Sequence, residues 1–161
     1  MITPFDASEA SLPSPCEIHI TRVVRAPREL VYRAWTDPEH LQHWWGPNGF
    51  TTTTYKMDFR PGGEWRFMMH GPDGRDYPNW IIYVEIVPNE RLVYKHGGEV
   101  GHEDVNFSST ILFEDVGSDT KVTMQSIFPS EEERDRVIRE YGAVEGGKQT
   151  LGRLAEYVER S

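Results

Sequence analysis

The longest helical pattern in the chain, residues 130–161, constrains its fold more than any other feature. Ser130 precedes three glutamates, and a serine followed three residues later by a glutamate is typical of a helix N-cap. The glutamates also suit the positive end of a helix dipole. Beyond them apolar residues recur at helical spacing, namely Val137, Tyr141, Val144, Leu151, Leu154, Ala155 and Val158. A helix of this length would extend about 45 Å, and its apolar stripe has to be buried against a sheet, because no second helix of comparable length is expected.

Four glycines fall inside this helical pattern, at Gly142, Gly146, Gly147 and Gly152. Each interior glycine costs a helix roughly 0.8–1 kcal/mol relative to alanine. At about 100° per residue, Gly147 falls within the apolar stripe, whereas Gly142 and Gly146 face away. The position of Gly147 therefore predicts either a close backbone approach or a hole next to the sheet. A kink or break near residues 142–147 is the alternative.

The composition excludes several classes of protein. The 161 residues suffice for one domain with a buried core. Acidic residues outnumber lysine plus arginine by 26 to 17 and no basic cluster is present, so nucleic acid is not an expected partner. No stretch approaches the ~20 apolar residues of a membrane span. The single cysteine, Cys16, cannot form an internal disulfide, and residues 1–16 lack the apolar run of a signal peptide. We therefore expect a cytoplasmic protein.

Turn and periodicity signals divide the chain into a flexible tail, residues 1–16, and one domain, residues 17–161. A strand at 17–25 is followed by two short helices, which begin near Ala26-Pro27 and Asp37-Pro38. Six further strands are expected at 51–59, 64–70, 77–87, 91–96, 105–114 and 121–128, with a polar loop at 97–104. This order predicts an α+β helix-grip fold: a curved antiparallel sheet of about seven strands wraps around the long C-terminal helix, with two short helices after the first strand.

The chain resembles a known family in short motifs spread over about residues 17–159. The motifs are Arg22, Ala26-Pro27, Val31, Ala34-Trp35-Thr36-Asp37-Pro38, Leu41, Trp44-Trp45-Gly46-Pro47, Asp58, Pro61-Gly62-Gly63, Gly71-Pro72-Asp73-Gly74, Pro88-Asn89-Glu90-Arg91-Leu92, Thr150-Leu151 and Arg153-Leu154. They are similar to those of the family named after the activator of the ninety-kilodalton heat-shock protein ATPase, within the START/SRPBCC/polyketide-cyclase superfamily. The resemblance implies the helix-grip fold, small-molecule binding for many relatives, enzymatic work for some and co-chaperone action for a few.

The residues expected to line a cavity between helix and sheet are mostly aromatic or apolar. They are Trp45, Trp65, Phe67, Met69, Tyr77, Trp80, Tyr83, Glu85, Phe107, Gly147 and Leu151. Trp65, Phe67 and Met69 alternate on one strand face and suit a hydrophobic ligand, although a filled core would use the same residues. Of the adjacent Trp44 and Trp45, one is expected in the core and the other at a rim, because neighbours on a helix do not face the same side.

Tyr83 and Glu85 are the candidates for proton transfer, together with Tyr77 or a histidine near the cavity mouth. Glu85 lies in the middle of the expected strand 77–87 and Tyr83 shares its face, and a buried carboxylate beside a tyrosine could act as an acid/base pair. The slightly favoured alternative is an outward Glu85 paired with a lysine or arginine across the sheet.

Two histidine groups could bind a metal ion, but neither forms a complete site in the sequence. His40 and His43 are three residues apart on a helix, and a solvated helix face is the preferred interpretation. The second group, His96, His102, Glu103 and Asp104, clusters around a glycine-rich loop, and a plain polar loop is the preferred interpretation. We therefore expect no metal and no cofactor, and we assign no catalytic residue.

The expected function is the binding of a small hydrophobic or aromatic molecule between the C-terminal helix and the concave sheet. One alternative is an enzyme of the cyclase, dehydratase or hydrolase type that uses the same cavity. The other is an accessory role on a chaperone. A chaperone partner is not expected, because the eukaryotic activators that the chain resembles carry an additional N-terminal domain. A homodimer is left open.

Gly147 provides a first test, because some relatives carry tryptophan at this position. If Gly147 leaves a void at the sheet, Gly147→Trp should fill it and abolish ligand binding. The melting temperature should stay level or rise, since removing an interior glycine helps a helix by up to about 1 kcal/mol. A melting curve of this variant tests the expectation, and a drop of many degrees would indicate a tight backbone contact instead.

Overall fold

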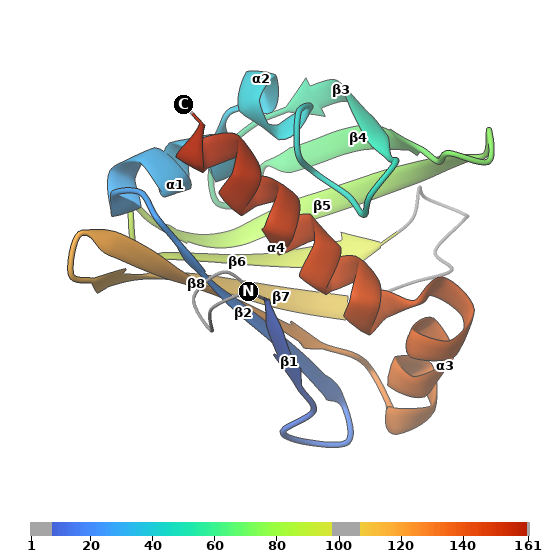
Figure 1. The fold of residues 1–161 in the computed structure, drawn as a ribbon. Helices are drawn as coiled ribbons and strands as arrows, with labels where there is room; N and C mark the ends of the chain where they lie inside the picture. Colours follow the sequence, from blue (N-terminus) through green and yellow to red (C-terminus); the bar gives the residue numbers. More distant parts are fainter. Residues whose placement is uncertain (1–7, 98–106, 161) are drawn as a thin grey trace.

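The computed structural model describes residues 8–97 and 107–160, which form a curved antiparallel sheet gripping a C-terminal helix (Figure 1). The strands are β1 (Glu9–Ser11), β2 (Glu17–Val24), β3 (Thr51–Met57), β4 (Glu64–His70), β5 (Asp76–Val87), β6 (Arg91–Gly97), β7 (Phe107–Val116) and β8 (Asp119–Ile127). The helices are α1 (Arg28–Thr36), α2 (Pro38–Leu41), α3 (Glu131–Tyr141) and α4 (Ala143–Glu159). None of the helices in these residues has the length and apolar character of a membrane span.

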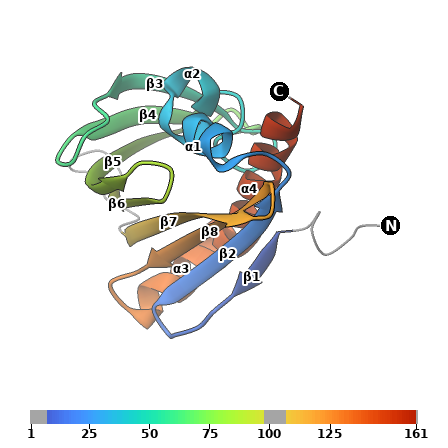
Figure 2. The same cartoon turned by 90° about the vertical axis from the view of Figure 1, so that its left-hand side faces the viewer.

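The sheet has the strand order β1-β2-β8-β7-β6-β5-β4-β3. The helix α4 crosses its concave face, with α1 and α2 near the C-terminal end of α4 and α3 at its N-terminal end (Figures 1 and 2). The α+β helix-grip fold predicted from the sequence is confirmed. The sheet has eight strands rather than about seven, because Glu9–Ser11 of the expected tail pairs with β2. The strand β1 has only three residues, all exposed, and sequence analysis recognises a strand by alternation over at least four residues.

The C-terminal segment is two helices and not the single long helix that we expected. Ser130 caps α3 as predicted, since its hydroxyl accepts a hydrogen bond from the backbone N–H of Glu133 at 3.1 Å. The break falls at Gly142, which has the left-handed conformation with φ 60° and ψ 41°. Glycine adopts this conformation without steric cost and commonly ends helices in this way. The alternative of a break near residues 142–147 is therefore the correct one.

Aromatic side chains fill the end of the groove next to α1 and α2. Trp35 makes edge-to-face contacts with three rings, those of Trp44, Trp45 and Phe113, at centroid distances of 4.9, 5.8 and 5.9 Å. Trp44 is completely buried and donates its indole N–H to the carbonyl of Ala34 at 3.1 Å. Trp45 is 9% exposed, so both tryptophans are buried, but only Trp45 lines the cavity described below. The cavity described below lies towards the other end of α4, next to α3.

Gly147 is a point of close approach between α4 and the sheet. A Cβ atom at this position would lie 2.1 Å from Cδ1 of Ile20 and 3.4 Å from Cε of Met124. Ile20 belongs to β2 and is itself buried. The expectation that Gly147→Trp fills a ready-made void is therefore wrong, because any side chain at residue 147 has to displace Ile20 first. Gly147 does face the sheet, as its place on the apolar stripe predicted.

A pair of conservative substitutions tests this contact. Gly147→Ala should lower the free energy of unfolding by about 1–2 kcal/mol, because the overlap with Ile20 outweighs the gain in helix propensity. Ile20→Val alone should cost about 0.5–1.5 kcal/mol. The double variant has no Cδ1 atom at residue 20. Its loss in free energy of unfolding should therefore be smaller than the sum of the two single losses by at least about 1 kcal/mol. Urea unfolding of the four proteins measures this coupling.

Gly152→Ala is the matched control for the helix effect. A Cβ there would meet only Nη1 of Arg22, at 3.7 Å, so this variant should be more stable than the wild type by up to about 1 kcal/mol. Strictly additive effects of Gly147→Ala and Ile20→Val would contradict the proposed overlap.

Candidate ligand-binding cavity

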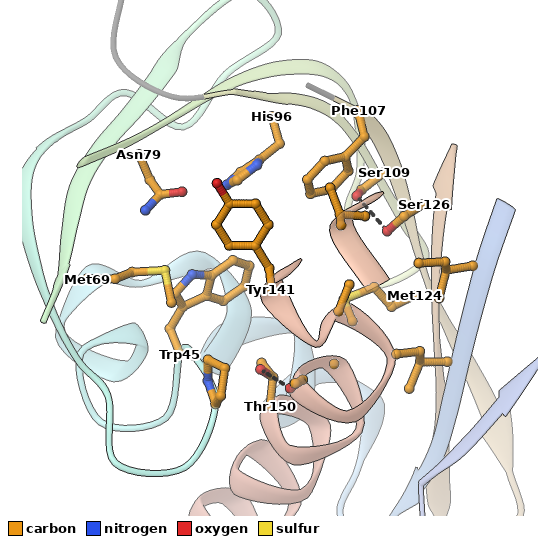
Figure 3. Close-up of a pocket in the computed structure, with 18 of the residues that line it drawn as sticks. Trp45, Met69, Asn79, His96, Phe107, Ser109, Met124, Ser126, Tyr141 and Thr150 are labelled. Atoms are coloured by element: carbon orange, nitrogen blue, oxygen red, sulfur yellow. Dashed lines mark hydrogen bonds between the residues drawn. The ribbon is translucent and has the colours of Figure 1, made fainter. Parts of the chain in front are cut away.

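A cavity of about 270 Å³ lies between the concave face of the sheet and the corner formed by α3 and α4 (Figure 3). Most of its wall is apolar, with side chains that include Ile18, Ile20, Trp45, Met69, Phe107, Met124, Phe128 and Val137. A smaller set of its side chains is polar: Asn79, Tyr94, His96, Ser109, Ser126, Tyr141 and Thr150. Gly46, Pro47, Ala143, Gly146 and Gly147 complete the lining.

The sheet register explains why these strand residues face the cavity together. In β2 and β8, Ile18 is opposite Ser126 and Ile20 is opposite Met124. Ser126 is in turn opposite Ser109 of β7. Residues directly opposite one another in an antiparallel sheet point to the same face, and the same face recurs every second residue. The apolar residues Ile18 and Ile20 of β2 therefore lie beside the hydroxyl groups of Ser109 on β7 and Ser126 on β8, so an apolar part of the wall adjoins a polar part.

Four of the residues expected to line the cavity do line it: Trp45, Met69, Phe107 and Gly147. Trp65 and Phe67 lie behind Trp45 and outside the lining. Their rings stack with centroids 3.8 Å apart, and Trp65 packs against Trp45 at 5.0 Å. Leu151 is completely buried one turn beyond Gly147 and is not part of the lining either. These three residues support the wall from within the core.

The polar and aromatic candidates from β5 lie elsewhere. Trp80 points away from the cavity, since its indole N–H donates to Oε2 of Glu64 at 2.7 Å and its ring lies under the guanidinium of Arg66. The ring of Tyr77 lies 5.9 Å from that of Phe50 and is not part of the lining. Strand β5 therefore contributes only Asn79 to the cavity.

Tyr83 and Glu85 do not form the acid/base pair that we considered. The pairing of β5 with β6 shifts between these two residues, because Tyr83 is opposite Tyr94 and Glu85 is opposite Val93. This β-bulge puts the two side chains on opposite faces. Tyr83 is buried, and burial raises the pKa of its phenol. Glu85 has 45% of its side chain exposed and forms an ion pair with Arg91. This is the alternative in which Glu85 points outward and pairs with a lysine or arginine across the sheet.

The polar wall contains a chain of hydroxyl groups. The hydroxyls of Ser109 and Ser126 lie 3.3 Å apart, within hydrogen-bond distance. The phenol of Tyr94 hydrogen-bonds to Ser109; burial raises the pKa of Tyr94, and this hydrogen bond opposes the rise. Tyr94 is therefore a neutral phenol throughout the physiological pH range.

His96 is a lining residue that sequence analysis placed in a strand, 91–96, but considered only as a metal ligand. It belongs to β6, where Leu92, Tyr94 and His96 share one face, and this alternation is the signal that could have found it. Its ring packs on Phe107 with centroids 4.6 Å apart. Burial lowers the pKa of His96 from 6.5 to about 4, so its imidazole is neutral at pH 7. Its Nδ1 atom is buried and has no hydrogen-bond partner.

No aspartate, glutamate, lysine or arginine of the described residues lines the cavity. An ionic ligand would lose its hydration there without meeting an opposite charge, and that loss is costly in a low-dielectric site. The lining thus favours a neutral ligand.

The histidines considered as metal ligands have other partners. Nδ1 of His40 lies 2.6 Å from the hydroxyl of Tyr157, and the ring of His43 stacks on the same tyrosine at 5.5 Å. Over residues 8–97 and 107–160 no three histidine, cysteine, aspartate or glutamate side chains are grouped as metal ligands would be. His102, Glu103 and Asp104 lie outside the described residues.

An antiparallel sheet closed around a C-terminal helix, with a cavity between them, defines a helix-grip protein. The chain belongs to the family described as "Activator of Hsp90 ATPase homolog 1-like protein", whose model matches residues 25–159.

Solved structures with the same fold come from several bacteria. A protein from Nitrosomonas europaea has 25% sequence identity and a TM-score of 0.81, covering 92% of this chain and 97% of its own. A protein from Arthrobacter aurescens has 24% sequence identity and a TM-score of 0.86, and the match covers 95% of this chain and 92% of its own. A protein from Chromobacterium violaceum has 28% sequence identity and a TM-score of 0.77, and the match covers 91% of this chain and 99% of its own. A search of curated proteins found no match.

Burial of His96 predicts a pH dependence of stability. In the unfolded chain the imidazole takes up a proton as the pH falls through 6.5, whereas in the folded protein it stays neutral down to about pH 4. Between pH 6.5 and about pH 4 the unfolded state binds more protons than the folded state. The free energy of unfolding therefore falls as the pH is lowered through this range, and it levels off below about pH 4. Relative to a His96→Phe variant, the wild type should lose at most about 3 kcal/mol over this range. Urea unfolding of both proteins from pH 7 to pH 4 measures the difference; parallel profiles would contradict a buried neutral imidazole.

Proposed function

We propose that the protein binds a small hydrophobic or aromatic molecule in the cavity between α4, α3 and the concave sheet. The observation that carries this proposal is a cavity of about 270 Å³ with a mainly apolar wall. An unfilled apolar cavity lowers stability, because the atoms that line it lack contacts on one side. A bound apolar molecule restores those contacts and is removed from water at the same time.

The size and lining of the cavity support a ligand with one or two rings. A cavity of about 150 Å³ is enough for benzene, so the present one has room for a second ring. Trp45 and Phe107 line it with aromatic rings, which favour stacked or edge-to-face contacts with an aromatic ligand. Met69 and Met124 are flexible and polarizable, so they can adapt to its outline.

The observed chemistry favours binding over acid–base catalysis at neutral pH. An efficient general acid or base has a pKa near the pH at which it works. Burial moves the pKa of His96 down to about 4 and raises that of Tyr94, so both groups are far from this condition. Tyr83 and Glu85 do not reach the cavity. No observation of the described residues favours a cyclase, dehydratase or hydrolase over a binding protein.

The chaperone-accessory alternative has no specific support in the described residues. The large apolar side chains that are exposed come from different segments; they are Leu12, Tyr55, Val84, Val116, Ile127 and Tyr141. A cytoplasmic location and the absence of a nucleic-acid partner stay predictions from the sequence, as does the single domain at residues 17–161.

A cavity-filling substitution tests the proposed function. Ser126→Phe places a ring in the cavity from the C-terminal end of β8, and strands tolerate aromatic residues well. Wild-type protein should give saturation-transfer NMR signals with several one- and two-ring aromatic compounds, and Ser126→Phe should weaken their binding at least about tenfold, because the ring and the ligand need the same space. Native mass spectrometry of the purified wild type shows in addition whether a molecule of this class copurifies.

Thr110→Phe is the matched control, because Thr110 lies on the other face of the neighbouring strand β7, between the buried Ser109 and Ile111. It adds the same ring outside the cavity and should leave binding unchanged. The proposal fails if no aromatic compound binds to the wild type, or if Ser126→Phe binds them as tightly as the wild type does.

A further inference from the structure

Three side chains on the convex face of the sheet, beside the turn between β4 and β5, form a chain of hydrogen bonds. Nε2 of His70 lies 2.9 Å from Oγ1 of Thr53, and Nδ1 of the same ring lies 2.7 Å from Oδ1 of Asp76. A base in contact with a hydroxyl, and oriented by a third group, is the arrangement that activates a nucleophile. None of the three residues lines the cavity.

The sheet register explains why these side chains meet. Met69 lines the cavity on the concave face, so its neighbour His70, the last residue of β4, points to the convex face. Asp76 is directly opposite His70 on β5. Thr51 of β3 is opposite His70 as well, and Thr53 follows two residues later. Opposite and diagonal residues of an antiparallel sheet share a face and lie within reach of a long side chain.

The turn between β4 and β5 keeps Asp76 in this register. It consists of Gly71-Pro72-Asp73-Gly74, one of the motifs noted in the sequence. The backbone N–H of Gly71 donates to the carbonyl of Arg75 at 2.8 Å, and Oδ1 of Asp73 accepts from the N–H of Arg75 at 3.0 Å. Because the turn is closed by its own hydrogen bonds, β5 begins at a fixed position beside His70.

The partners of the imidazole define its role. In a neutral imidazole one nitrogen donates and the other accepts. The carboxylate of Asp76 can only accept, so Nδ1 of His70 carries the proton and Nε2 accepts from the hydroxyl of Thr53. Thr53 is exposed, and the side chains of His70 and Asp76 are 37% and 58% exposed. A small molecule therefore reaches the hydroxyl from solvent.

We propose that Thr53 is an acyl-acceptor site, with His70 as its base and Asp76 as the residue that positions His70. The donor is a small activated acyl compound, such as a reactive ester or thioester. Oγ1 of Thr53 attacks the carbonyl carbon of the donor while its proton passes to Nε2 of His70. The bond between that carbon and the leaving group then breaks, and the leaving group takes up the proton. The product is an ester on Thr53, and nothing is oxidised or reduced.

The location of the site suits this step. Strand β3 is the last strand of the sheet, so the N–H groups on its outer side have no strand partner. Backbone N–H groups of this kind are common donors to the oxyanion that forms during acyl transfer. The step modifies the protein itself on the convex face, so it neither needs nor tests ligand binding in the cavity.

Acetylation by p-nitrophenyl acetate at pH 8, mapped by peptide mass spectrometry, tests the proposal within the wild type. Thr51 is the internal control, because it is exposed like Thr53 and lies opposite His70, but the hydrogen bond from the imidazole goes to Thr53. We expect at least about tenfold more acetyl ester on Thr53 than on Thr51, since a positioned base typically contributes about 10²–10⁴-fold. Alkaline hydroxylamine should remove this ester and leave acetylated lysines intact.

Substitution of the base gives the second readout. His70→Gln should reduce acetylation of Thr53 to the level of Thr51, because glutamine cannot take up the proton. His19→Gln is the matched control, since His19 also lies on the convex face but its Nε2 contacts the carboxylate of Glu17 at 3.0 Å and no hydroxyl. This control should acetylate Thr53 as fast as the wild type.

Asp76→Ala and Asp76→Glu test the positioning role. The alanine variant should acetylate Thr53 at least about threefold more slowly, and the glutamate variant should recover most of the rate, because its carboxylate can again accept from Nδ1. Equal rates in the two variants would contradict this role.

The comparison of two threonines in the wild type decides the matter even where a variant fails to fold. Equal acetylation of Thr51 and Thr53 would overturn the proposal, and so would full acetylation of Thr53 in His70→Gln. Either result leaves the proposed ligand binding intact, because the two sites share no residue.

Discussion

The close approach of α4 to β2 at Gly147 is the contact on which the shape of the cavity depends. At this residue the backbone of the helix lies directly against Ile20, closer than any side chain would allow. Four residues along the helix from this contact, Leu151 is completely buried, so α4 is held firmly along one side of the groove. The left-handed turn at Gly142 then sends α3 in a new direction over the end of the sheet. The space enclosed by this corner and by strands β5 to β8 is the cavity.

Burial also determines the chemistry of that space. Tyr94 and His96 face a wall in which the described residues contribute no charged side chain. Removal from water disfavours the charged forms of both groups, so the phenol and the imidazole stay neutral over a wide pH range. Such a lining suits the neutral ligand proposed above better than a charged one. The aromatic cluster around Trp45 packs the end of the groove next to α1 and α2.

The candidate site could be predicted only in part, and the reasons differ between residues. Met69 and Phe107 lie on strands whose alternation is regular, so their direction followed from the period of the strand. In β5 a single extra residue between Tyr83 and Glu85 reverses the faces that follow, and no turn residue or glycine signals it. The sequence pattern did not decide which face of β5 is inward, so Trp80 was included although it points away. His96 was correctly assigned to a strand, but it was missed as a lining residue because it was considered only as a metal ligand together with the polar residues that follow it.

What the sequence determined by itself was the α+β helix-grip class, the strands β2 to β8, the cap at Ser130 and the apolar stripe that includes Gly147. These features follow from local signals, because hydrophobic periodicity and turn residues act over a few positions along the chain. Only the tertiary structure decided that the terminal helix breaks at Gly142 and that Gly147 meets Ile20 and leaves no void. It alone left Nδ1 of His96 without a partner. These outcomes depend on which atoms other segments bring close in space, and no local pattern contains that information.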